Sequence, residues 1–153
     1  VAVMNGGVCQ LYSYTYQQSN GEQDEIAFTE KRDISDWADG MTAECRMFTN
    51  CIEVPLNYLY IVKGNDLWRT SYASQEAPQK VRSFPAPITV AEVICDSPRQ
   101  SASAKELYTA LFTYDEGTDI SKMYVLDATS EDVAILSEVE TEIPGKVVAY
   151  RAN

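Results

Sequence analysis

Short strand-like runs bounded by turn residues constrain the fold of this chain more than any other feature. Val, Ile, Tyr, Phe and Thr gather in these runs, and Gly, Asn, Asp or Pro separate them. Because β-branched and aromatic residues favour strands, the pattern predicts an all-β fold of antiparallel hairpins. We count about ten to twelve such runs. The clearest are 8–16, 25–31, 58–62, 66–72, 88–95, 107–114, 122–126, 133–138 and 146–151.

Turn-forming sequences lie between these runs and predict tight chain reversals at 19–21, 63–66, 115–117 and 144–145, because Gly, Asn and Asp tolerate positive φ. Helical periodicity is weak throughout. The segment 34–38 is expected to form one short helical turn, capped by Asp33 or Ser35 and ended by Gly40. The segment 103–111 fits a strand by its alternation and a helix by its composition.

A possible internal repeat rests on the dipeptide Leu-Tyr. It occurs at Leu11-Tyr12, Leu59-Tyr60 and Leu107-Tyr108, at a spacing of 48 positions. Propeller blades of four short strands have periods of about 40–50 residues, so the spacing is compatible with a blade-like repeat. Coincidence is the alternative in a chain with ten tyrosines. The length of 153 residues predicts one β-rich domain, 1–153, in a propeller-like or sandwich arrangement.

The four cysteines favour an oxidising compartment. The chain has an even number of cysteines, Cys9, Cys45, Cys51 and Cys95, with no Cys-x-x-Cys pair, and it has no histidine. The usual motifs of zinc sites and of thioredoxin-like redox sites are therefore absent from the sequence. Disulfides Cys45–Cys51 and Cys9–Cys95 are the preferred pairing among three. Val1 in place of an initiator Met favours a processed chain. Together these features predict a periplasmic or extracellular protein.

The net charge of −11 ranks the possible partners. Such a charge repels nucleic acid and anionic lipid and attracts cationic partners. The alternative is that the charge only keeps the protein soluble. No apolar run approaches the roughly 20 residues that span a bilayer, so membrane insertion is not expected.

The absence of histidine argues against catalysis, because serine and cysteine nucleophiles and metal hydrolases usually need an imidazole. The acidic doublets Asp24-Glu25, Asp115-Glu116 and Glu131-Asp132 are the remaining candidates for a carboxylate pair. Neighbours on a strand point to opposite faces, so these doublets are more typical of solvated turns. The acidic turns 115–119 and 127–132 do not match a calcium loop, and we predict no metal and no cofactor.

Two features offer binding surfaces. Tyr12, Tyr14 and Tyr16 alternate along one predicted strand, so they would line one face, as a platform for sugars or protein or as ordinary cross-strand packing. Trp37 and Trp68 fit either a core or an interface.

The second feature is the small and polar segment 97–104, which follows a strong strand and predicts an exposed loop. A loop of this composition can enter a narrow enzyme cleft, or simply connect two strands. The candidate partner-binding residues are Ser97, Arg99, Gln100, Ser101 and Ser103.

An acidic, histidine-free, processed β-rich chain with propeller-like strands at Leu59-Tyr60 and Leu67-Trp68 resembles the periplasmic immunity proteins of bacterial type VI secretion, in particular the β-rich inhibitors of a peptidoglycan amidase effector. In that family a loop plugs the cleft of a cysteine-histidine amidase. The resemblance implies that segment 97–104 plays this role, that the partner is a secreted hydrolase, and that the protein confers immunity without being an enzyme. The alternative is a secreted carbohydrate-binding or adhesin-type β module.

Overall fold

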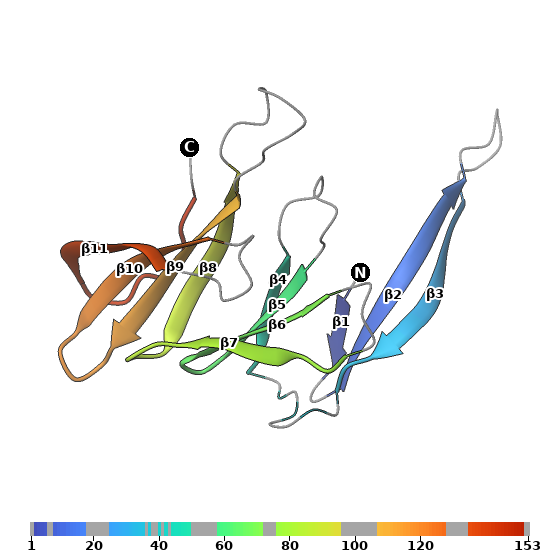
Figure 1. Cartoon of the computed structure of the whole chain (residues 1–153), viewed down its shortest axis with the longest axis horizontal. Helices are drawn as coiled ribbons and strands as arrows, with labels where there is room; N and C mark the ends of the chain where they lie inside the picture. Colours follow the sequence, from blue (N-terminus) through green and yellow to red (C-terminus); the bar gives the residue numbers. More distant parts are fainter. Residues whose placement is uncertain are drawn as a thin grey trace. The chain divides into compact units, whose positions relative to one another are not determined.

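The computed structural model describes residues 2–5, 8–17, 25–35, 37, 40, 42, 44–49, 58–71, 76–95, 107–127 and 135–151. Within these ranges the chain forms eleven strands and no helix, which confirms the all-β prediction (Figure 1). None of the described segments is therefore a helix long and apolar enough to cross a membrane.

The eleven described strands form three antiparallel sheets. In each sheet every strand pairs with its neighbour in the sequence, in the orders β1-β2-β3, β4-β5-β6-β7 and β11-β10-β9-β8. The bounds are β1 Ala2–Asn5, β2 Val8–Gln17, β3 Glu25–Asp33, β4 Arg46–Thr49, β5 Tyr58–Lys63, β6 Asp66–Ser71, β7 Gln79–Ser83, β8 Ile88–Cys95, β9 Leu107–Asp115, β10 Ile120–Asp127 and β11 Ile135–Pro144. The antiparallel hairpins predicted from the sequence are thus confirmed.

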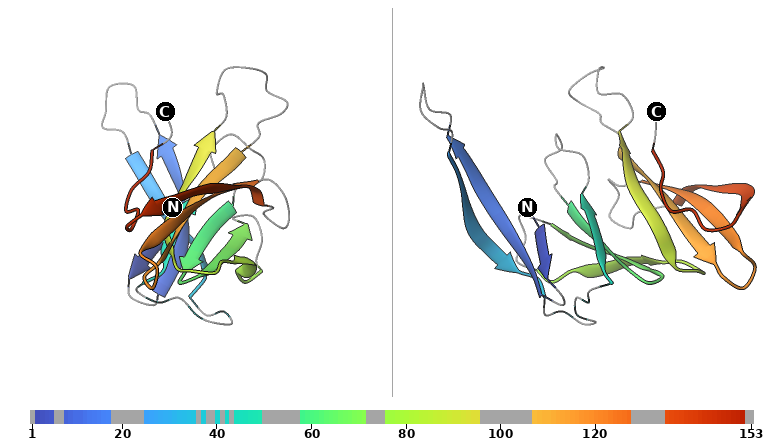
Figure 2. Two further views of the ribbon diagram at one scale, coloured as in Figure 1. Left: turned by 90° about the vertical axis from the view of Figure 1, so that its left-hand side faces the viewer. Right: turned by 180° about the vertical axis from the view of Figure 1, so that it is seen from behind.

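The chain divides into two compact units, residues 1–44 and 45–153, and the single domain 1–153 stays a prediction. The division follows from the pairing, because no described strand of the first unit pairs with a described strand of the second. The first unit contains β1, β2 and β3. Figure 2 shows that β2 and β3 continue well beyond β1, in agreement with a register that pairs β1 only with Val8–Leu11 of β2.

The segment after β3 has some features of the predicted helical turn without being helical. The described residues of 34–40 are in no helix. Asp33 accepts a hydrogen bond at Oδ1 from the backbone N–H of Ser35 at 2.7 Å. The interactions with the side chain and then with the backbone of Ser35 lower the pKa of the carboxyl group. Gly40, at φ +63°, donates its N–H to the carbonyl of Trp37 at 2.6 Å and closes a turn. The predicted capping residues therefore form tight turns instead.

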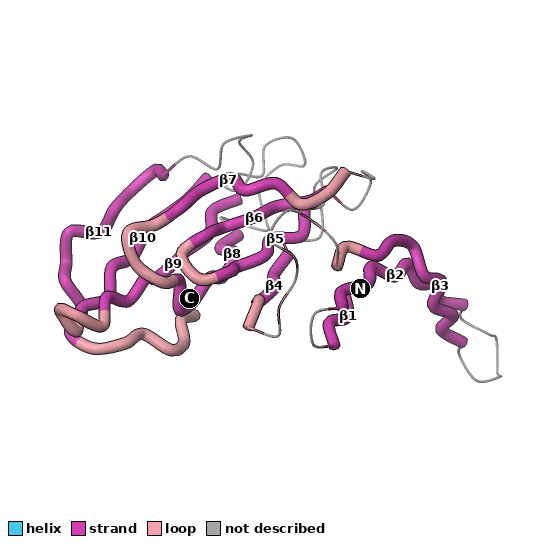
Figure 3. Tube along the Cα trace, turned by 90° about the horizontal axis from the view of Figure 1, so that it is seen from below, coloured by secondary structure: helices cyan, strands magenta, loops and turns pink. Residues whose placement is uncertain are grey.

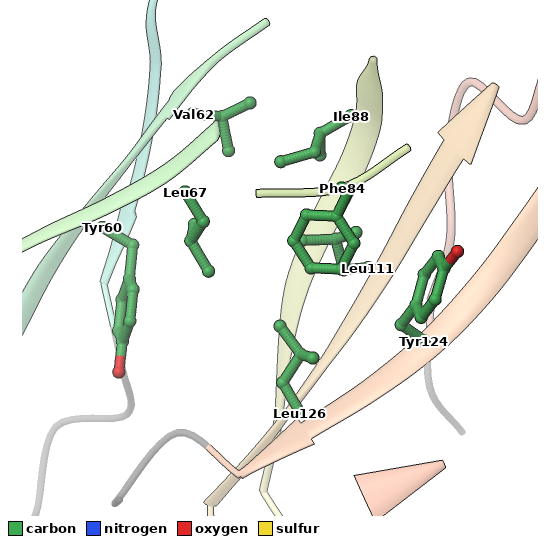
Figure 4. Close-up of a cluster of buried hydrophobic side chains, with 8 residues drawn as sticks. All are labelled: Tyr60, Val62, Leu67, Phe84, Ile88, Leu111, Tyr124 and Leu126. Carbon is green, nitrogen blue, oxygen red and sulfur yellow. The ribbon is translucent and has the colours of Figure 1, made fainter. Parts of the chain in front are cut away.

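The second unit consists of the two four-stranded sheets, whose strands are traced in magenta in Figure 3. Their buried side chains form one common core, contributed by both sheets and by the β7–β8 connection (Figure 4). The core consists of Tyr60, Val62, Leu67, Phe84, Ile88, Leu111, Tyr124 and Leu126. The rings of Phe84 and Tyr124 meet edge to face with their centroids 5.0 Å apart. Two sheets that share a core in this way agree with the predicted sandwich-like stacking.

The tip of the β5–β6 hairpin ties the two sheets together. Gly64, at φ +59°, takes the first central position of a two-residue turn between Lys63 and Asp66, where a type II′ turn requires positive φ. The carbonyl of Gly64 accepts a hydrogen bond from the N–H of Ile88 at 3.0 Å, and Asn65 exchanges bonds with Phe84 at 2.9 and 3.3 Å. The predicted turn at 63–66 is thus confirmed and also holds the β7–β8 connection.

The three Leu-Tyr pairs occupy equivalent places in the topology. Leu11-Tyr12 lies in β2, Leu59-Tyr60 in β5 and Leu107-Tyr108 in β9, and each of these is the second strand of its sheet. The spacing of 48 residues is therefore the distance along the chain from the second strand of one sheet to the second strand of the next.

The predicted strand at 146–151 is wrong, because these residues form no strand. Gly145, at φ +83°, turns the chain at the end of β11. Beyond it, the N–H of Val147 donates to Ser121 Oγ at 3.1 Å, while the Ser121 hydroxyl donates to the carbonyl of Gly145 at 2.7 Å. The buried hydroxyl of Ser121 thus makes the hydrogen bonds that a partner strand would otherwise make with this segment.

The structure contains neither of the preferred disulfides. Cys9 and Cys45 are buried thiols, and each predicted bond, Cys9–Cys95 or Cys45–Cys51, requires one of them. Cys51 lies outside the described residues. Cys9 shares the buried face of the first unit with Leu11, whereas Cys95 ends β8 in the second unit, so the long bridge would have to join two units.

Candidate binding surface on the first unit

The partner-binding residues predicted from the sequence, Ser97, Arg99, Gln100, Ser101 and Ser103, lie outside the described residues, as does the whole segment 97–104. The strands on either side are described. β8 and β9 pair until Cys95 stands opposite Leu107. Residues 96–106 therefore connect neighbouring ends of two adjacent strands, and the strand alternative for residues 107–111 is confirmed.

The tyrosine stripe lies on β2, as predicted. Tyr16 is 53% exposed, and Tyr12 is half-buried with its hydroxyl donating to Gln10 Oε1 at 2.7 Å. The side chain of Tyr14 is not among those described. The opposite face of β2 carries Cys9 and Leu11, which are fully buried. The even-numbered residues of β2 thus form the exposed face of the sheet.

The register extends this face across the neighbouring strands. Ile26 stands opposite Tyr16, and Phe28 stands opposite Tyr14, and in antiparallel sheets residues directly opposite share a face. Ile26 is 57% exposed and Phe28 is 61% exposed. Val3 on β1 and Val8 on β2 belong to the same face and are also about half exposed. Most of the large exposed apolar side chains in the described part of the chain therefore lie on one face of one sheet.

The far end of the β2–β3 hairpin is open to solvent on both faces. Every described side chain of 15–17 and 25–29 is exposed, on either side of the ribbon. β1 pairs only with Val8–Leu11, so at this end the sheet has two described strands. We call residues 15–17 and 25–29 the arm. A two-stranded ribbon with exposed apolar residues is only marginally stable in water unless another surface covers it.

Sequence reasoning found the tyrosines of this face and missed Ile26 and Phe28. The signal was present, because Ile26 and Phe28 are two residues apart in the predicted strand 25–31 and so share a face. Their position opposite the tyrosines depends on the hairpin register, which composition does not reveal. Trp37 and Trp68, which fitted either a core or an interface, are each only 6% exposed and belong to the core.

Asp115-Glu116, the acidic doublet of which the structure describes both residues, lies in a solvated turn. Asp115 and Glu116 are exposed in the β9–β10 turn, where Asp115 Oδ1 accepts the N–H of Gly117 at 2.9 Å. The Tyr114 hydroxyl donates to Asp119 Oδ1 at 2.8 Å, and this bond raises the pKa of Tyr114. Asp24, Glu131 and Asp132 lie outside the described residues. In the described ranges no three acidic, cysteine or histidine side chains gather as a metal site would require.

Two open pockets of the second unit are lined by described residues. The larger, of about 420 Å³, is lined by Tyr58, Arg69, Thr70 and Glu76, among others. The Arg69 guanidinium lies 4.3 Å from the centre of the Tyr58 ring, a cation–π contact. The smaller, of about 300 Å³, is lined by residues that include Asp115, Lys122, Tyr124 and Glu142. Polar groups supply a large part of the lining of both pockets, whereas small-molecule sites are usually lined mainly by apolar groups with a few convergent polar ones.

The exposed apolar face of β1–β3, with the arm at its end, is therefore the clearest binding surface among the described residues. Comparison of the chain with models of protein families, with curated proteins and with solved structures gives no match.

Proposed function

We propose that this chain is a binding protein that inhibits a secreted cell-wall hydrolase of the peptidoglycan amidase class, and so confers immunity on the cell that produces it. In this proposal the segment 97–104 enters the active-site cleft of the hydrolase. Ser97, Ser101 and Ser103 would offer hydroxyls to the catalytic groups, with Arg99 and Gln100 beside them.

The pairing of β8 with β9 is the observation that carries the proposal. Because the two strands remain paired until Cys95 and Leu107, the eleven residues of 96–106 leave and rejoin the sheet at adjacent positions. A connection of this length between paired strands is long for a hairpin loop, and long loops on a rigid sheet commonly carry function. The small side chains of 97–104 suit a narrow cleft.

The experiment measures release of soluble fragments from peptidoglycan by a purified amidase encoded beside this chain, with and without the purified protein. We expect inhibition at a ratio near one to one. A variant in which 97–104 is replaced by a glycine-serine segment of equal length should lose inhibition and keep the wild-type thermal midpoint. Glu116→Ser is the matched control, because the exposed β9–β10 turn lies at the other end of β9. Equal inhibition by the replaced variant, or no inhibition by the wild type, contradicts the proposal.

A further inference from the structure

We infer that the β1–β3 face and its arm form a second interaction surface, separate from segment 97–104, and that its partner is a cationic protein whose contact surface has apolar residues surrounded by Lys and Arg. This inference does not depend on the proposed hydrolase inhibition. It rests on the exposure of the face, on its chemical composition and on the charge of the first unit.

The composition of the face is that of a protein interface core. Tyr16, Ile26 and Phe28 are each more than half exposed and stand together at the far end of the hairpin. Aromatic residues are enriched in interface cores, and a contiguous exposed apolar patch on a folded domain commonly marks an interaction site. The two valines extend the patch along the same face with more aliphatic surface. Aliphatic side chains give a sugar neither a stacking plane nor a hydrogen bond, so the composition favours protein over glycan.

The charge of the first unit favours a partner that is positively charged. Residues 1–44 contain eight acidic and two basic residues, a net charge of −6 in less than a third of the chain, out of −11 for the whole. A second copy of this chain would bring −6 against −6, and nucleic acid or anionic lipid would also be repelled. A basic surface gains both from the attraction and from covering the apolar residues. The acidic charge of the first unit and its exposed apolar residues therefore both favour a cationic protein over these other partners.

The arm exposes apolar surface and a strand edge that such a partner could cover. Both faces of the arm are exposed, and β3 pairs with β2 alone among the described strands, so its outer edge faces no other described strand. Covering Ile26 and Phe28 would remove apolar surface from water at one end of the first unit, where the described part of the sheet has two strands.

The test selects a phage-displayed library of random peptides against the full-length chain and measures the affinities of the enriched peptides by calorimetry. We expect these peptides to combine Lys or Arg with aromatic or aliphatic residues. The double variant Ile26→Thr and Phe28→Thr keeps β propensity and should weaken their binding about tenfold or more, the size of effect found at interface hot spots. Val148→Thr, a substitution of an exposed side chain in the second unit, should change it less than about twofold. Binding should also weaken as salt rises from about 0.05 to 0.5 M.

Several results would overturn the inference. Enrichment of neutral or acidic peptides, no enrichment, or equal binding by the arm variant removes the cationic partner. A glycan-array signal that the arm variant loses would assign the face to sugars, and a concentration-dependent dimer that the variant loses would assign it to a second copy. Loss of hydrolase inhibition in the 97–104 variant, with peptide binding intact, shows that the two surfaces act separately.

Discussion

The guanidinium group of Arg46 donates hydrogen bonds to the carbonyl oxygens of Ile88 and Thr89, so that one side chain links β4 to β8, the first strands of the two four-stranded sheets. The carbonyls are available because the β8–β9 register shifts between Ile88 and Val90. A β-bulge of this kind leaves part of the ladder unpaired, and here a charged donor uses it.

Replacing Arg46 should destabilise the second unit. In Arg46→Met two carbonyls lose a charged donor while the aliphatic stem is largely kept, and we expect the free energy of unfolding to fall by about 1–2 kcal/mol. Urea unfolding of the full chain measures this change. Lys146→Met, at an exposed position, is the control and should leave the midpoint within error. Equal midpoints for the two variants would show that the link contributes nothing.

Gly64→Ala should weaken the turn that clasps the β7–β8 connection. No atom lies within 4 Å of the position of an added Cβ, so the cost comes from the backbone conformation at φ +59° and not from a clash. We expect a loss of about 1–2 kcal/mol, seen as a lower thermal midpoint. Gly117→Ala is the comparison, because Gly117 is not at positive φ and its added Cβ would meet only the side-chain oxygen of exposed Asp115, at 3.3 Å. A larger loss at Gly117 than at Gly64 would contradict this explanation.

Leu126→Ala tests the common core of the two sheets. Leu126 is fully buried on β10 among side chains of both sheets. Its truncation removes apolar contacts and leaves a cavity, so we expect a loss of about 2–5 kcal/mol in the free energy of unfolding. Val148→Ala, at a side chain 79% exposed, should change the value by about 0.5 kcal/mol or less. Similar effects from both substitutions would mean that the core is not shared as described.

Tyr60 should make stability depend on alkaline pH. Burial raises its pKa above the unfolded value near 10, although Arg69 acts in the opposite direction. The folded chain therefore holds this proton more tightly than the unfolded chain. The resulting stabilisation is complete below about pH 10 and is lost as pH rises through the folded pKa. We expect the wild type to lose stability above about pH 10 more steeply than Tyr60→Phe. Chemical unfolding at several pH values, with Tyr16→Phe as control, measures the difference, and parallel curves for wild type and Tyr60→Phe would refute it.

Much of the fold could be read from the sequence where strands are central and turns are tight. The run 88–95 coincides with β8, and the Gly64-Asn65 turn joins β5 and β6 as expected. The strands absent from the clearest runs are β1, β4 and β7, and all three are edge strands in their sheets. Edge strands bury one side less completely and carry more charge, so their apolar pattern is weaker. The failure at 146–151 has a different cause, because a hydroxyl 26 residues away, that of Ser121, takes the place of a partner strand.

The binding surface could be predicted only in part. Alternation placed the tyrosines on one face of β2, since the period of a strand is fixed by its geometry. It could not place Ile26 and Phe28 opposite them, because pairing depends on the register of the whole hairpin. The disulfides were inferred from an even cysteine count, which carries no information on distance, and the structure has thiols at Cys9 and Cys45. The role of 97–104 stays a prediction.

The pairing of described strands that follow one another in the sequence has a consequence for the speed of folding. All eight pairs of described strands join consecutive strands, so each of these ladders closes after a short stretch of chain. Loop closure over short stretches costs little entropy, and all-β proteins fold slowly mainly when their strands pair across long separations. Each meander can therefore zip from its own hairpin turns, and we expect the second unit to fold faster than a Greek-key sandwich of similar size.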